Sequence, residues 1–143
     1  HYGLFSMTYS ESRFTALDGI ERKGTYEQNW IINLGAGWIF NKNWEASMKF
    51  RFATGKPYTP YNADGTQDVD KYNTAKTIAN HSLDIRIDRK WDLDGYNIIA
   101  YVDIQNIYNR KNSSFVRWDK RDKKEVSSST IGILPSIGLS LEM

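Results

Sequence analysis

Apolar and polar residues alternate with a period of two along most of this chain. In the run from Trp44 to Phe52 every second residue is apolar, and the residues between them are polar or charged. Successive side chains of a β-strand point to opposite faces, so this spacing predicts strands with one apolar and one polar face. The pattern predicts about six such strands, near 5–10 and 28–40, at 44–52, 81–91 and 95–108, and at 136–143.

The two expected faces differ sharply in chemistry. We expect one face to contain Ala46, Met48, Phe50, Leu83, Ile85, Ile98, Ala100, Val102 and Ile104. We expect the other to contain Glu45, Lys49, Arg51, Asp84, Arg86 and Asp103, with Ile99 as an apolar exception. A charge on a lipid-facing wall costs roughly 2–4 kcal/mol at mid-bilayer, so in a membrane the apolar face would meet lipid and the charged face a lumen.

The connections between the expected strands alternate in length. The connections at 41–43 and 92–95 are short, whereas 13–27, 55–80 and 109–132 are long and polar. Outer-membrane β-barrels have short turns at one end and long loops at the other. Aromatic residues also flank both short turns, as in the girdle at a membrane interface: Trp38, Phe40, Trp44, Trp91 and Tyr96. The pattern favours an all-β, antiparallel transmembrane barrel segment over a soluble sheet with one buried face.

Composition excludes several other classes. The 143 residues are enough for one domain or for a piece of a larger one, and a net charge of +2 is too weak to indicate nucleic acid. No run approaches the ~18 apolar residues of a membrane helix. The chain has no Cys, which fits an envelope protein and a cytosolic protein equally. It has no recognisable signal peptide at its start.

Three segments of the chain follow a recognisable order and spacing. They are FRFATGKPYTPY at 50–61, YVDIQNIYNR at 101–110 and ILPSIGL at 133–139, of which DIQNIYN at 103–109 is the most specific. These segments resemble the final barrel strands of TonB-dependent receptors of the Bacteroidetes type, and the resemblance covers essentially all 143 residues.

The resemblance implies that residues 1–143 are the C-terminal part of a transmembrane barrel, about six strands of one that has 22 in such transporters. The plug domain and the TonB box have no counterpart in this chain. The implied function is uptake of a scarce solute across the bacterial outer membrane. The implied partners are the lipid bilayer and lipopolysaccharide, the TonB complex through the N-terminal part, the barrel assembly machinery and a surface lipoprotein, with no nucleic acid.

Two groups of residues are candidates for function. In the longest connection, at 55–80, exposed tyrosines and acids are candidate ligand-binding residues, although the tyrosines can equally pack the loop onto the barrel rim. This group is Tyr58, Tyr61, Asp64, Asp68 and Tyr72. At the end of the chain, the spacing of Gly138, Leu141 and Met143 resembles the signal that the assembly machinery reads. We expect Gly138 to leave its inner face open and Pro135 to precede this last strand.

No constellation in the chain indicates catalysis, a metal or a cofactor. The acids of 62–70 do not match the ligand register of an EF-hand, and His1 and His81 have no further metal-binding partners in sequence. The serines of 127–129 have no nearby base, so the chain is not expected to be an enzyme. The basic loop at 117–124 is read as a solvated hairpin tip or as a contact for lipopolysaccharide phosphates.

Two alternative functions remain open at this point. The chain can be a small complete outer-membrane barrel that acts as an adhesin, an anchor or a hydrolase. It can also be a soluble β-sheet module that binds a ligand such as a carbohydrate.

Overall fold

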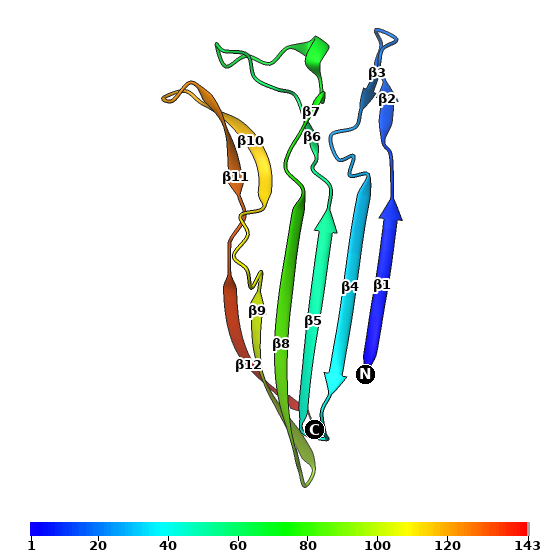
Figure 1. Ribbon diagram of the computed structural model, residues 1–143, viewed down its shortest axis with the longest axis vertical. Coiled ribbons are helices and arrows are strands. Elements are labelled where there is room, and N and C mark those ends of the chain that lie inside the picture. The colour runs from blue at the N-terminus through cyan, green and yellow to red at the C-terminus, as the bar shows by residue number, and fades with distance from the viewer. Residues whose placement is uncertain (143) are drawn as a thin grey trace.

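Six long strands form one antiparallel sheet in the computed structural model, which describes residues 1–142 (Figure 1). The strands lie side by side in chain order, from one edge to the other. They are β1 (Tyr2–Tyr9), β4 (Trp30–Ile39), β5 (Trp44–Ala53), β8 (Asn80–Leu93), β9 (Tyr96–Gln105) and β12 (Leu134–Glu142). The predicted number of about six strands and their antiparallel arrangement are therefore confirmed.

Several strand boundaries differ from the prediction by one to three residues, and two of these differences are informative. The strand expected at 95–108 ends at Gln105, because Asn106 adopts a positive φ of 52° that breaks the extended backbone. The last strand begins at Leu134, two residues earlier than expected, so Pro135 lies inside the strand, opposite Ile104. Because β12 is an edge strand within the described residues, a proline there need not remove a ladder hydrogen bond.

The three long connections each carry a hairpin. The sequence pattern did not predict the first two, whereas the third has its tip within 117–124, the segment that was read as a hairpin tip. β2 (Arg13–Thr15) pairs with β3 (Glu21–Lys23), β6 (Pro57–Tyr58) with β7 (Ala75–Lys76), and β10 (Ser113–Asp119) with β11 (Lys124–Ser129). A 3-10 turn, η1 (Val69–Lys71), lies between β6 and β7. All three hairpins extend beyond the same end of the main sheet, and the two short turns lie at the opposite end (Figure 1).

Strand register shows how side chains are distributed between the two faces, because residues directly opposite each other share a face. Met48 pairs with Ile85, which pairs with Ile104, whereas Lys49 pairs with Asp84. Arg86 pairs with Asp103 on the same charged face. The predicted division of residues into an apolar and a charged face is therefore confirmed for the described sheet.

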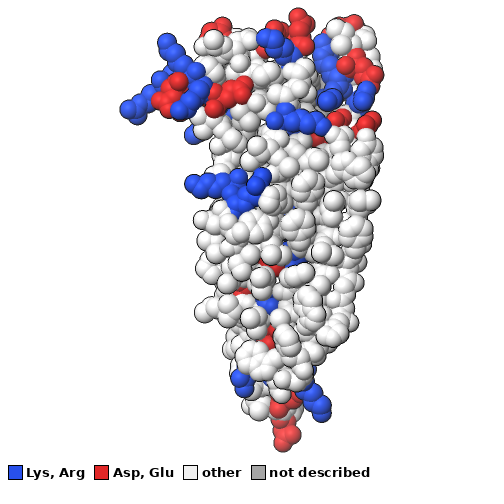
Figure 2. Space-filling model, in the orientation of Figure 1, with Lys and Arg blue, Asp and Glu red and all other residues white. Residues whose placement is uncertain are grey.

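The sheet is a single layer, and its apolar face is uncovered. Within residues 1–142, no hydrophobic side chain is fully buried, while Ile137 and Leu139 are 83% and 73% exposed. On the side of the molecule that Figure 2 shows, charged side chains gather toward the two ends, and the long middle part is mostly uncharged. No helix in the described part of the chain has the length and apolar character needed to cross a membrane.

Candidate functional site

The charged face carries a shallow depression of about 310 Å³. The side chains that line it include Lys49, Arg51, Asp84, Arg86 and Asp103. The ion pairs on this face do not join directly opposite residues. Arg51 Nη2 lies 3.0 Å from Asp84 Oδ2 across a diagonal, and Arg86 binds Asp88 along its own strand. These two ion pairs balance part of the charge on this face.

Tyrosine rings cover two glycines on the charged face. A Cβ atom at Gly138 would lie 2.3 Å from Cζ of Tyr101, and a Cβ at Gly37 would lie 2.1 Å from Cζ of Tyr2. The guanidinium carbon of Arg86 lies 3.8 Å from the centre of the Tyr101 ring. The expectation that Gly138 leaves its inner face open is therefore wrong: the missing side chain is replaced by the ring from the neighbouring strand.

The DIQNIYN block forms the upper end of β9 and the turn that follows it. The Asn106 backbone N–H donates to Asp84 Oδ1 at 2.9 Å. The buried Asn106 side chain accepts from the Arg110 N–H and donates to the Arg110 carbonyl. Asn109 Oδ1 accepts from the Ile133 N–H at 3.0 Å. This block therefore joins the loop ends of β8, β9 and β12.

Two further asparagines replace backbone pairing where β8 extends beyond the loop end of β9. Asn112 accepts the His81 N–H at 2.9 Å and donates to the His81 carbonyl at 2.9 Å. Asn80 makes the same two bonds to the backbone of Ser113. Each side-chain amide therefore occupies the place of a backbone peptide group, which sequence reasoning missed because the partners lie about thirty residues apart.

The candidate tyrosines of the longest loop contact the two neighbouring loops. The Tyr58 hydroxyl donates to Glu125 Oε2 at 2.9 Å, and the Tyr61 backbone N–H donates to Glu125 Oε1 at 2.7 Å. On the other side, the Tyr72 hydroxyl lies 3.2 Å from Thr25 Oγ1. These contacts tie the loop to β11 on one side and to the β2–β3 hairpin on the other.

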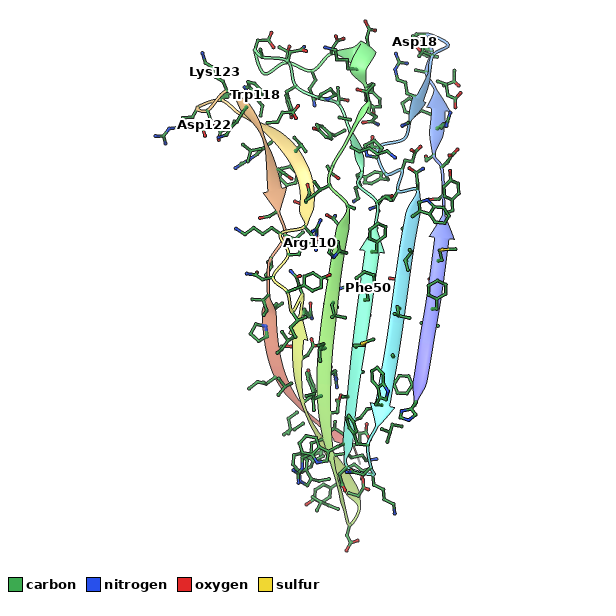
Figure 3. The ribbon with its side chains drawn as sticks, viewed as in Figure 1. Asp18, Phe50, Arg110, Trp118, Asp122 and Lys123 are labelled. Atoms are coloured by element: carbon green, nitrogen blue, oxygen red, sulfur yellow. The ribbon has the colours of Figure 1, made fainter. Side chains whose placement is uncertain are left out.

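Packing around Trp118 strengthens this arrangement. The Trp118 ring, near the tip of the β10–β11 hairpin (Figure 3), lies 6.0 Å from the Tyr61 ring. It also lies so close to Gly65 that a Cβ there would approach Trp118 Cδ1 to 2.6 Å. We call the three connections, residues 10–29, 54–79 and 106–133, the loop rim; the middle one contacts each of the other two. The Tyr58, Tyr61 and Tyr72 side chains help hold this rim together.

The two candidate acids of the same loop shape the local backbone. Asp64 Oδ1 accepts from both the N–H and the hydroxyl of Thr66, and these hydrogen bonds hold the pKa of the Asp64 carboxyl below its usual value. Asp68 caps η1 by accepting the Asp70 N–H at 3.0 Å. At the tip of the β2–β3 hairpin, Arg22 lowers the pKa of Asp18 to about 2 through a side-chain hydrogen bond.

At the short-turn end, aromatic residues gather on the apolar face. Trp38, Trp44, Trp91 and Tyr96 lie there, each between 37% and 43% exposed. The sequence had indicated this cluster but had not indicated Arg89, which belongs to the same face because it pairs with Trp44. The guanidinium carbon of Arg89 lies 4.9 Å from the ring centres of both Trp44 and Trp91.

The candidate assembly residues lie on different faces of β12. Gly138 pairs with Tyr101 on the charged face, whereas Leu141 pairs with Ile98 on the apolar face and is 57% exposed. Met143 lies outside the described residues. No group of three or more His, Cys, Asp or Glu within residues 1–142 is arranged to hold a metal ion.

No family model, no curated protein and no solved structure matches the chain.

Proposed function

We propose that this chain is a wall segment of a transmembrane β-barrel in the bacterial outer membrane, and that the barrel is a TonB-dependent transporter. The observation that carries the proposal is the single-layer sheet with an uncovered apolar face, a charged opposite face and an unpaired edge at β1 and at β12. A soluble domain buries its apolar face against a second layer, and within the described residues there is no such layer.

Strand length supports the membrane assignment. β4, β5 and β9 each contain 10 residues, and a transmembrane strand tilted by about 45° needs roughly 9–11. The exposed aromatic residues at the short-turn end match a girdle at one interface. The short turns then face the periplasm, and the loop rim lies outside the cell.

The uptake of a scarce solute is supported by the resemblance of the 50–61, 101–110 and 133–139 segments and by the charged inner face. Side chains that neutralise one another along the strands suit a wall that faces water or a polar plug. The partners in this proposal are the TonB complex and the barrel assembly machinery, a surface lipoprotein above the rim, and lipopolysaccharide near the basic 117–124 tip.

The five candidate ligand residues enter the proposal in a changed role. Three of them hold the loop rim together, so we propose that the rim acts as one preformed surface over the lumen. A rigid scaffold that presents long loops is a common place for binding.

The transport proposal is tested in the full-length protein that contains this segment. We expect deletion of 62–76 to reduce TonB-dependent uptake strongly while the barrel still inserts, because the deletion removes the centre of the rim and leaves every long strand intact. Growth on limiting iron complexes, cobalamin, peptides and glycans, with and without TonB, identifies the solute and measures the effect.

A deletion of 120–123, at the exposed tip of the β10–β11 hairpin, is the matched control and should keep most of the uptake. Uptake that continues without TonB would contradict the transporter class. Full uptake after deletion of 62–76 would contradict the role of the rim.

A further inference from the structure

Arg89 is an isolated charge on the apolar face. Among the six strands of the described sheet, it is the one Lys, Arg, Asp or Glu on that face. It takes part in none of the ion pairs within residues 1–142. Its two indole neighbours contribute cation–π attraction, but neither balances its charge. An exposed guanidinium in this setting is therefore free to bind an anion.

An apolar groove of about 570 Å³ begins beside Arg89. Its walls are Ile87, Val102, Ile137 and Leu139, of which Ile137 and Leu139 are the most exposed. Ala100, a small residue, also lines the groove and lies directly between Arg89 and Leu139 in one row across three strands. The groove therefore has a cation at one end and hydrocarbon along its length.

The direction of the groove matches the orientation of a membrane lipid. Arg89 lies at the level of Trp44, the first residue of β5 after the short turn, whereas Ile87 and Val102 lie closer to the middle of the sheet. A lipid of the leaflet beside the short turns places its phosphate at the interface and its chains toward the bilayer centre. Arginine is well suited to phosphate because its planar fork donates two parallel hydrogen bonds.

We propose that Arg89, Trp44 and Trp91, together with this groove, form a binding site for one phospholipid. Its phosphate binds Arg89 between the two indole rings, and one acyl chain extends from beside Ala100 past Ile87, Val102 and Ile137 toward the bilayer centre. This inference rests on the proposed membrane location and adds a defined lipid site to it. The commitment to a phospholipid follows from charge complementarity, because the unpaired cation stands at the end of an otherwise apolar surface.

The test uses the full-length protein, extracted in detergent and titrated with dioctanoyl phosphatidylglycerol under native mass spectrometry. Wild type should bind one lipid in preference to further copies. Arg89→Gln should weaken that first binding about tenfold, the effect expected from losing one hydrogen bond to a charged group. Arg89→Lys should fall between them because it keeps the charge but loses the fork. Ala100→Phe should also weaken binding, because it fills the groove without changing any charge.

Lys90→Gln is the matched control, since it removes a positive charge one residue away on the opposite face and should bind as wild type does. Equal binding by wild type and Arg89→Gln would overturn the lipid site. The lipid site would also be overturned if wild type retained a second protein copy instead of lipid and Arg89→Gln lost that copy. If the wild-type protein does not fractionate with the outer membrane, the proposed function fails, and the lipid site fails with it.

Discussion

At the loop end of the sheet, side-chain amides form hydrogen bonds that backbone peptide groups form elsewhere in the sheet. Asn80 and Asn112 each donate and accept one hydrogen bond with a backbone peptide of the facing segment. A buried peptide group without a partner is costly, and these amides remove that cost where regular pairing has ended. Asn106 and Asn109 of the DIQNIYN block act in a similar way, because their side chains bond the backbone of Arg110 and Ile133.

Gly138 and Tyr101 form the contact at which one added methyl group has the clearest predicted effect. We expect Gly138→Ala to destabilise the folded full-length protein by about 1–3 kcal/mol, because the new Cβ would overlap the Tyr101 ring, which is held from its other side by Arg86. Tyr101→Ala in the same background should recover part of that loss. Denaturant unfolding followed by tryptophan fluorescence measures both effects.

Gly35→Ala is the control for this prediction, since a Cβ at Gly35 meets nothing closer than Leu4 Cβ at 4.0 Å. Equal effects of Gly35→Ala and Gly138→Ala would show that loss of glycine itself, and not the ring contact, determines the stability. The double-mutant comparison isolates the pairwise interaction, provided that Tyr101→Ala introduces no new contact.

At the scale of single elements, alternation was sufficient to predict the six long strands. It failed for the β2–β3 and β6–β7 hairpins, because Arg13–Thr15 and Pro57–Tyr58 are too short to show a period and both their sides are polar or mixed. It also misplaced the end of β9, which was expected to run to 108 although the backbone turns at Asn106. Asn106 occupies the next position of the apolar series that ends at Ile104, so the break in alternation coincides with the turn.

The contact between Glu125 and the 55–80 connection is the element-level link with the simplest test. We expect Glu125→Ala to increase the rate of tryptic cleavage at Lys71 several-fold, because the variant loses the bonds to Tyr58 and to the Tyr61 N–H that hold this loop against β11. The rate is followed by mass spectrometry on the intact, membrane-inserted protein.

Asp122→Ala serves as the comparison variant. Asp122 pairs with Lys124 at the exposed tip of the same hairpin and makes no contact with the 55–80 connection. If both variants are cleaved at the wild-type rate, the Glu125 bonds contribute little to the order of the rim, and the loops move independently of one another.

For the molecule as a whole, no apolar core is buried within the described residues, so the sheet has no interior of its own to stabilise it. Each edge strand of the sheet is paired on one side only, so the outward N–H and C=O groups of β1 and β12 have no strand partner. The apolar face is also left exposed. We therefore expect the segment to become stable only as part of a closed wall in lipid.

A pair of arginine substitutions tests this account of the two faces. Met48→Arg should sharply reduce the amount of folded barrel in the outer membrane, since a charge on the lipid side costs roughly 2–4 kcal/mol near the midplane. Gln105→Arg should be tolerated, because Gln105 belongs to the charged face. It follows Ile104, which lies on the apolar face in the same row as Met48. Heat-modified electrophoretic mobility of outer-membrane fractions reports the folded amount. Equal tolerance of both variants would contradict the lipid assignment.

The sequence alone could predict much of the face chemistry but little of the rim. Lys49, Asp84 and Met48 were assigned to the correct faces, because parity along a strand decides the matter. The roles of Tyr58 and Tyr72 could not be read, because their partners Glu125 and Thr25 lie in other connections. The same holds for Arg89, whose position between two indoles depends on the pairing of β5 with β8.

Strict alternation also has a consequence for the gene. Loss of one codon inside β5 would exchange the two faces for the remainder of that strand, since neighbouring residues belong to opposite surroundings. Loss of one codon within 62–68 would change only the length of an exposed connection. Inheritable length variation is thus expected in the codons of the three long connections, whereas the codons of the six long strands should vary by substitution alone.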